Sequence, residues 1–158
     1  MLTYAQNYLQ LRQGGRTLAP VLAVYYLTTH CNLNCAYCED FGARRNPEAV
    51  EIPDLEQVLQ ILGVIRTGMA RLWLTGGEPL LVPHLPELLS RSRTELKFRA
   101  ITLILNGTLL ADRLDILPHL DRLVISLDSL ETQTLDAINL TPLPKDEVLN
   151  AIERAALR

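Results

Sequence analysis

The stretch VLAVYYLTTHCNLNCAYC, residues 21–38, holds the two features that decide the fold of this chain. Residues 21–27 form a continuous run of aliphatic and aromatic side chains, which predicts a strand buried on both faces, as in a parallel sheet. The three cysteines follow at once, so we expect them at the C-terminal end of this strand. In barrels of parallel strands, the active site lies at that end.

Cys31, Cys35 and Cys38 are the only cysteines in the chain, and all three fall within residues 31–38. An odd number of closely spaced thiols suggests one metal centre rather than a disulfide framework. A structural zinc ion needs four ligands, and an iron–sulfur cubane is normally held by one cysteine per iron. Three thiolates would therefore leave one iron of a cubane open to a substrate or cofactor.

Two other interpretations of the cysteines remain open. A zinc ion could be completed by one of the three histidines, His30, His84 or His119. His30 fits this less well, because neighbouring residues in an extended chain point in opposite directions. Alternatively, the last two cysteines could form a redox-active Cys-x2-Cys pair, which would leave Cys31 without a role.

A second strand is predicted at residues 71–75, and it runs directly into Gly76-Gly77-Glu78-Pro79. Two glycines at the end of a strand let the backbone turn sharply and approach a ligand closely. The carboxylate of Glu78 and nearby backbone carbonyls would accept hydrogen bonds from an ammonium group. By itself, this stretch is equally compatible with a tight turn that exposes a glutamate.

Two further strands are predicted, and polar residues stand at their ends. Residues 98–105 lead into Asn106, where the dipeptide Asn-Gly is typical of a turn but also offers a polar pocket side chain. In residues 122–128 the alternation of a strand would place Ser126 and Asp128 on the same face. Polar side chains on a buried strand need partners, so both are candidate pocket residues.

Helices are predicted between these strands from apolar residues at helical spacing. The pattern indicates an α/β domain of four strand–helix units at residues 20–158, preceded by a helical extension at residues 1–19. A loop is expected at residues 41–52. One predicted helix is capped by Asp54 and has Gly68 just beyond its end, and the others are residues 3–12, 85–92, 111–120, 131–138 and 145–158.

The cysteine spacing, with Tyr37 before the last cysteine, and Gly-Gly-Glu-Pro after the second strand resemble the signature of the radical S-adenosylmethionine (radical SAM) superfamily. The resemblance covers about residues 20–158. It implies a TIM-barrel-like core, here a partial (β/α) barrel of about four parallel βα units. It also implies a [4Fe–4S] cluster whose fourth iron binds the amino and carboxylate groups of S-adenosyl-L-methionine (SAM), and reductive cleavage of SAM to a 5′-deoxyadenosyl radical.

The resemblance assigns roles to individual residues. The three cysteines would ligate irons, the Gly-Gly-Glu-Pro stretch would hold the methionine end of SAM, and a polar set would complete the pocket. Where the family often has threonine before Asn-Gly, this chain has Leu105, which weakens the match there. The expected site residues are Cys31, Cys35 and Cys38 for the metal, and Gly76, Gly77, Glu78, Pro79, Tyr37, Asn106, Ser126 and Asp128 for SAM.

The family core has six strand–helix units, whereas four are visible here, which favours a fragment of a longer enzyme. Two alternatives remain: a non-catalytic zinc or iron–sulfur module, and a remnant that keeps the fold without the chemistry. An exposed strand edge after the fourth unit would need cover. The substrate is not indicated by these residues.

The composition limits the class of partner and the compartment. A net charge of −3 argues against a nucleic-acid surface, which would be basic. No signal peptide and no apolar run long enough for a membrane span are found. Reduced, clustered cysteines favour the cytoplasm. The resemblance further implies an external one-electron donor of the flavodoxin or ferredoxin kind and an unknown substrate.

Overall fold

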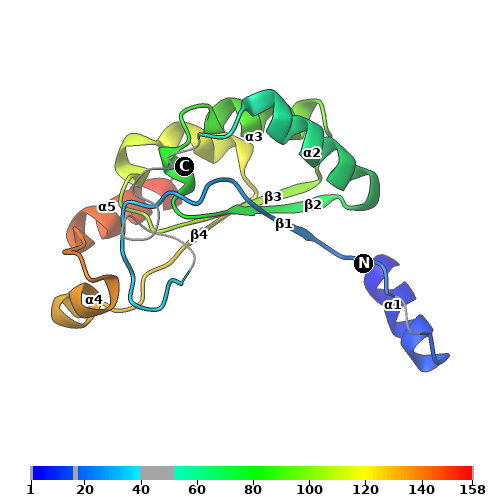
Figure 1. Ribbon diagram of the computed structural model, residues 1–158, viewed down its shortest axis with the longest axis horizontal. Helices are drawn as coiled ribbons and strands as arrows, with labels where there is room; N and C mark the ends of the chain where they lie inside the picture. Colours follow the sequence, from blue (N-terminus) through cyan, green and yellow to red (C-terminus); the bar gives the residue numbers. More distant parts are fainter. Residues whose placement is uncertain (1, 16–17, 40–51, 158) are drawn as a thin grey trace.

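The computed structural model describes residues 2–15, 18–39 and 52–157, and its centre is one parallel sheet (Figure 1). Each strand pairs with the next along the chain, in the order β1-β2-β3-β4, and the sheet stays open. This confirms the predicted α/β fold with a partial barrel of parallel strands. The strands are β1 (Ala23–Tyr26), β2 (Arg71–Thr75), β3 (Ala100–Leu105) and β4 (Arg122–Ile125).

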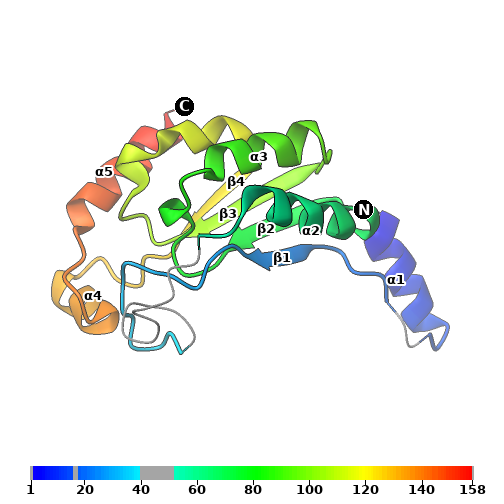
Figure 2. The ribbon, with the colours of Figure 1, turned by 45° about the horizontal axis from the view of Figure 1, so that its top comes forward.

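Three helices lie on one face of the sheet and build the core with it (Figure 2). They are α2 (Leu55–Gly68), α3 (Leu85–Thr94) and α5 (Lys145–Ala156). Leu62 of α2 and Leu85 of α3 are fully buried against strand residues such as Leu72 and Leu103. Alternate strand residues face the helices because successive side chains point to opposite sides of a sheet. This core fixes where the strand ends lie.

The opposite face of the sheet differs from the sequence prediction. Val24 and Tyr26 of β1 are 45% and 57% exposed, so the first strand is buried on one face rather than on both. Their neighbours in register, Trp73 and Thr75, are also only partly buried. The run of apolar residues does not reveal this, because burial on the second face depends on whether another layer covers it.

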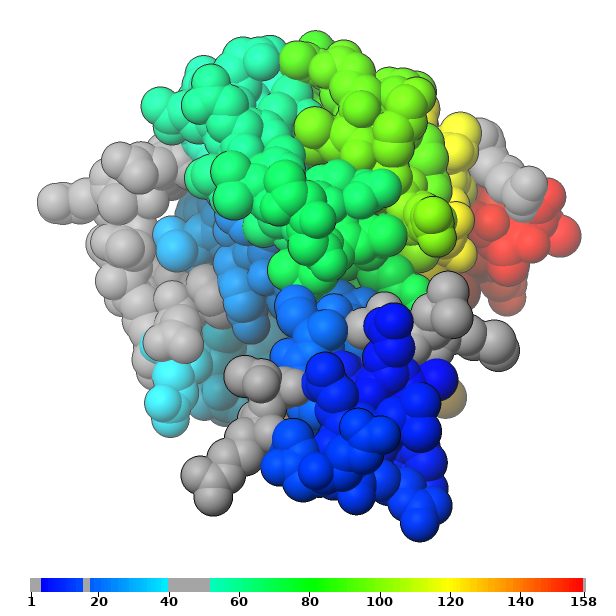
Figure 3. Space-filling view, turned by 90° about the vertical axis from the view of Figure 1, so that its right-hand side faces the viewer, coloured from blue at the N-terminus to red at the C-terminus, as the bar shows by residue number. Residues whose placement is uncertain are grey.

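The helix α1 (Leu2–Arg12) confirms the helix predicted near the N-terminus and stands out from the body of the molecule (Figure 3). Gly14 follows with a φ of +78°, a conformation that suits glycine after a helix. The amide side chain of Asn7 pairs with both the backbone N–H and C=O of Ala19, at 3.0 and 2.8 Å. That pair links α1 to the segment that leads into β1. The division at residues 19 and 20 stays a prediction.

Local signals for the next helix are confirmed. The side chain of Asp54 caps α2 by accepting a hydrogen bond from the Gln57 amide at 2.9 Å. The helix includes Gly68, which the sequence placed just beyond its end. The loop expected at residues 41–52 lies outside the described residues, except for Ile52.

Two predictions for the second half of the chain are wrong. The helix expected at residues 111–120 is replaced by two 3₁₀ helices, η2 (Leu110–Asp112) and η3 (Leu114–His119), and Pro118 lies inside the second. Proline cannot donate the backbone bond that a longer α-helix would need, whereas short 3₁₀ turns tolerate it. A third short 3₁₀ helix, η1 (Pro79–Leu81), follows the Gly-Gly turn.

The strand expected at residues 122–128 is also shorter than predicted. It ends at Ile125, and only the amide of Ser126 continues the pairing, donating to Leu105 O at 2.9 Å. Asp128 therefore lies beyond the sheet, before α4 (Thr132–Asn139). Period-two alternation carries no signal for where pairing stops.

Candidate functional site

A pocket of about 150 Å³ lies at the C-terminal ends of the strands, where the sequence placed the site. All three thiols line it, together with the Gly-Gly turn after β2 and the residues that follow β3 and β4. Segments far apart in the chain meet here because parallel strands bring their C-terminal ends to the same edge. The lining residues are Cys31, Leu33, Cys35, Tyr37, Cys38, Thr75, Gly76, Gly77, Ile104, Leu105, Asn106 and Ser126.

The Gly-Gly turn packs directly against the backbone that leads into Cys31. Gly77 N donates to Thr28 O at 2.7 Å, and Glu78 N donates to His30 O at 2.8 Å. A Cβ atom on Gly77 would lie 2.1 Å from His30 O, and one on Gly76, whose φ is +145°, would lie 2.5 Å from Thr28 O. Both glycines are required because two backbones meet there, which places the cysteine loop beside the end of β2.

The side chain of Glu78 is fully buried and joins the ends of β2 and β3. Its Oε1 accepts from Leu80 N at 2.9 Å, and its Oε2 accepts from Asn106 N at 2.8 Å. Burial raises the pKa of this carboxyl, and the two amide hydrogen bonds offset part of that rise. Among the described residues that line the pocket, neither Glu78 nor Pro79 occurs. Each carboxylate oxygen nevertheless has a second lone pair to offer.

Asn106 is the centre of a ring of side-chain hydrogen bonds that holds the cysteine loop. Its Nδ2 donates to Asn32 Oδ1 at 2.9 Å, while Asn32 Nδ2 donates to Thr108 Oγ1 at 2.8 Å. Thr108 Oγ1 donates back to Asn106 Oδ1 at 2.7 Å and closes the ring. Asn106 Nδ2 also lies 3.8 Å from Cys31 Sγ. The sequence indicated Asn106 but not Asn32 or Thr108.

The three thiols differ in exposure, since only Cys31 is buried and the other two are partly exposed. Cys31 is buried, and Leu33 N lies 3.4 Å from its sulfur. Burial raises the pKa of Cys31, which the Leu33 hydrogen bond partly opposes, and burial likewise raises the pKa of Cys35. All three cysteines are free of disulfides.

Tyr37 and Asp128 form an outer contact of the site. Tyr37 is exposed for most of its surface, and its hydroxyl donates to Asp128 Oδ2 at 3.1 Å. The contact joins the cysteine loop to the segment after β4. Ser126 and Tyr37 line the pocket, whereas Asp128 is not among its described lining residues. Asp128 thus reaches the site only through Tyr37.

The donor set can be tested against a [4Fe–4S] cluster. Within the described residues, no three His, Cys, Asp or Glu side chains are arranged around a point that could hold one metal ion. A cubane takes each cysteine at a different iron, so its ligands surround a volume instead of a point. The three thiols line such a volume, and beside it the amide nitrogen of Asn139 is buried without a hydrogen-bond partner in the described structure. These residues fit the cluster.

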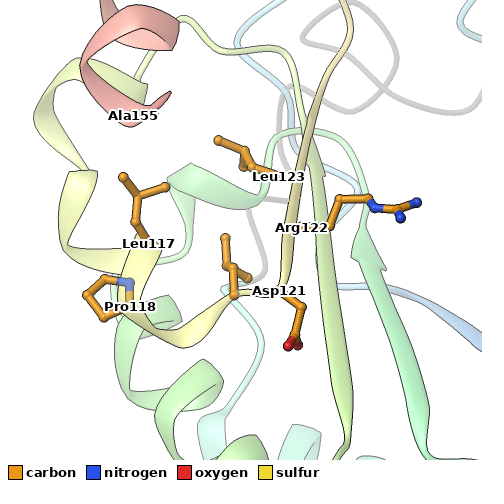
Figure 4. Close-up of a pocket in the computed structure, with 7 residues that line it drawn as sticks. Leu117, Pro118, Asp121, Arg122, Leu123 and Ala155 are labelled. Atoms are coloured by element: carbon orange, nitrogen blue, oxygen red, sulfur yellow. The ribbon is translucent and has the colours of Figure 1, made fainter. Parts of the chain in front are cut away.

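A larger groove, of about 430 Å³, lies at the start of β4 between η3 and α5 (Figure 4). Leu117 and Leu123 face it, while Arg122 extends to the other side of the strand. Cys31, Cys35 and Cys38 do not line it. Size therefore does not identify the candidate site, since the three thiols line the smaller pocket.

The fold and the pocket together define a class, and comparison with known proteins agrees. The model of the Radical SAM superfamily matches residues 25–157, so this chain belongs to that superfamily. It is 34% identical over 131 residues to a probable GTP 3′,8-cyclase of Methanocella arvoryzae, covering 82% of this chain and 41% of the relative. It is 39% identical over 116 residues to GTP 3′,8-cyclase 2 of Mycobacterium bovis, covering 71% and 32%.

Solved structures share this fold, among them a radical SAM enzyme of known structure. The crystal structure of SuiB from Streptococcus suis, bound to S-adenosylmethionine, matches 96% of this chain and 34% of its own length, with a TM-score of 0.64 and 20% sequence identity. The chain thus spans about two fifths or less of the length of these proteins. Membership of the superfamily confirms the resemblance and implies an enzyme family whose cofactors are a [4Fe–4S] cluster and SAM.

The comparisons leave the individual site residues as predictions. In the described part of the chain, no helix is long and apolar enough to cross a membrane.

Proposed function

We propose that Cys31, Cys35 and Cys38 hold a [4Fe–4S] cluster and that SAM binds in the same pocket. The observation that carries this proposal is the meeting of three thiols and the Gly-Gly turn in one pocket at the C-terminal ends of four parallel strands. When bound, the cluster supplies one electron for cleavage of SAM to methionine and a 5′-deoxyadenosyl radical. The protein supplies binding, orientation and exclusion of water.

The Gly-Gly turn is proposed to receive the methionine end of SAM. Gly76 and Gly77 line the pocket and lack side chains that would obstruct a ligand. Backbone carbonyls of this turn would accept hydrogen bonds from the ammonium group. Glu78, buried behind the turn, adds a negative charge and keeps the end of β2 fixed to that of β3 through Asn106. Pro79 starts η1, whose Leu80 amide donates to the Glu78 carboxylate.

The opposite wall of the pocket is proposed to complete the SAM site. Asn106 and Ser126 line it from the ends of β3 and β4 and offer hydrogen-bonding side chains. Tyr37 lies at the pocket beside the last cysteine, where its backbone would contact the adenine, and Asp128 holds its ring. A purely structural cluster would not need this polar wall, which argues against a non-catalytic module.

The chain spans about two fifths or less of the length of the named relatives, so their reaction comes to this chain only as a proposal. The named relatives make a GTP cyclisation the first reaction to test. The electron would come from an external one-electron donor of the flavodoxin or ferredoxin kind. Because the thiols are free, we propose the cytoplasm, a reducing compartment, as the location. Binding of the cluster and SAM by these four units, without turnover of a substrate, is the alternative that the open sheet favours.

The test is electron paramagnetic resonance of the chain reconstituted with iron and sulfide without oxygen and then reduced. We expect a [4Fe–4S]⁺ signal that changes when SAM is added and does not change with adenosine, which lacks the amino and carboxylate groups. Alanine at any one of the three cysteines should abolish the signal. A signal indifferent to SAM would contradict SAM binding, and tightly bound zinc without a cluster would contradict the whole proposal.

A further inference from the structure

Asn139, the last residue of α4, contacts Cys35, and the sequence did not indicate this contact. The Cys35 thiol donates to Asn139 Oδ1 at 3.1 Å, across 104 residues of sequence. Asn139 is 2% exposed, and its Nδ2 is buried without a hydrogen-bond partner in the described structure. A buried amide N–H without a partner bears the full cost of its lost hydration, so this arrangement calls for a physical reason.

The end of α4 is fixed to the cysteine loop at two successive residues. Next to the Asn139 contact, Ile138 O accepts a hydrogen bond from Ala36 N at 2.8 Å. Leu140 then takes a left-handed conformation, with φ of 53°, and ends the helix. Leu135 packs with Cys35 in a small apolar cluster beneath this contact. The side chain of Asn139 is therefore held beside the sulfur and excluded from water.

The buried Nδ2 group of Asn139 gains an acceptor when Cys35 is a metal ligand. A metal-bound thiolate carries no hydrogen and accepts hydrogen bonds only. Rotation of the amide by half a turn exchanges Oδ1 and Nδ2, two groups of nearly equal size, and brings an N–H to the sulfur. The buried donor then has its partner, and an acceptor takes its former place, where a missing partner is less costly.

We propose that Asn139 is a positioning residue for the cluster, which donates a hydrogen bond from Nδ2 to the Cys35 thiolate. The inference rests on the proposed function. Hydrogen bonds to the sulfurs of an iron–sulfur cluster stabilise the more negative, reduced state and raise the reduction potential. Asn139 thus makes the cluster easier to reduce and fixes the orientation of the second cysteine.

The test is the midpoint potential of the reconstituted cluster in the full chain, followed by electron paramagnetic resonance during a redox titration without SAM. Asn139→Leu, which keeps the volume but removes the donor, should assemble the same cluster at a more negative potential. Asn139→Asp, of the same shape but without an N–H, should shift the potential further in that direction. The control Asn7→Leu makes the same change in α1, at the other end of the molecule, and should leave the potential unchanged (Figure 1).

The outcomes separate the two proposals. A wild-type chain that assembles no cluster overturns the proposed function and this inference with it. If the wild type assembles a cluster and its midpoint potential equals that of the Asn139→Leu cluster, this inference alone is overturned. Should circular dichroism show that the leucine variant does not fold, the potential of the aspartate variant decides the question by the same criterion.

Discussion

At each end of the sheet, a carboxylate accepts a hydrogen bond from a backbone amide at the corresponding end of β3, but the surroundings of the two carboxylates differ. At the C-terminal end, Glu78 accepts from the amide of Asn106, the residue directly after β3. At the N-terminal end, Asp121 accepts from the amide of Ile101 at 2.7 Å, near the start of β3. Each carboxylate thus joins β3 to a neighbouring strand, but the first is fully buried and the second is 44% exposed.

The N-terminal end pairs its carboxylate with a cation. Arg93 of α3 forms an ion pair with Asp121 and donates to the backbone oxygens of Phe98 and Arg99, both at 3.2 Å. Burial opposes ionisation of Asp121, but the Arg93 hydrogen bond and charge and the Ile101 amide outweigh it, so the pKa of Asp121 is lowered. At the other end, burial raises the pKa of Glu78.

The contrast agrees with the proposal that the C-terminal end of the sheet is the binding end. An acid paired with arginine and partly exposed stabilises the fold at little cost in desolvation. A buried acid supported only by amide hydrogen bonds is costly, and such groups occur mainly at functional sites. The larger groove lies at the stabilising end and the thiols at the other, in line with the division of roles in barrels of parallel strands.

The largest effect at the C-terminal end of the sheet is expected from Gly77→Ala. The new Cβ would lie 2.1 Å from His30 O, a backbone atom that cannot move without displacing the cysteine loop. We expect a loss of about 3 kcal/mol in the free energy of unfolding, measured by urea denaturation, and failure to assemble the cluster. Gly68→Ala is the matched control, because apart from its own helix backbone and chain neighbours no described atom lies within 4 Å of its added Cβ. Equal stability of the two variants would contradict the tight backbone contact.

A milder change at the same end is Glu78→Gln. Glutamine keeps the shape but replaces one acceptor by an NH₂ group, so either the Leu80 or the Asn106 amide faces a donor inside the core. The expected loss is about 1–3 kcal/mol, measured by denaturation of the chain without cluster. Glu87→Gln, on the exposed surface of α3, should change stability by less than about 0.5 kcal/mol. Similar values for both would show that the two amide bonds do not stabilise the fold.

The smallest effect is expected at the N-terminal end, from Asp121→Asn. Because Asp121 is 44% exposed, solvent screens its ion pair, and we expect a loss of about 1 kcal/mol near pH 7. Its pKa is lower in the folded than in the unfolded chain, so this stability is complete above the unfolded pKa and disappears as the pH falls through the folded pKa. Thermal melting between neutral and strongly acidic pH should therefore show the wild type and the variant converging below the ordinary aspartate pKa. Parallel curves would contradict the assignment to Asp121.

Sequence patterns predicted most of the architecture because strands and helices are signalled by residues that lie close together in the sequence. The apolar run before Cys31 and the cap at Asp54 depend on near neighbours, and each is found at its predicted place. Element ends were less predictable. The end of β4 at Ile125 and the 3₁₀ helices around Pro118 depend on which partner groups are within reach in space.

The sequence alone determined the three clustered thiols and, through the resemblance of their spacing and of the Gly-Gly-Glu-Pro stretch, the superfamily. Only the tertiary structure decided how the thiols are held. Asn106 approaches Cys31 from the end of β3, and Asn139 approaches Cys35 from the end of α4. The same holds for the burial of Glu78. Contacts across 75 and 104 residues leave no periodic pattern in the chain, because they arise when packed strands and helices bring distant segments to one edge of the sheet.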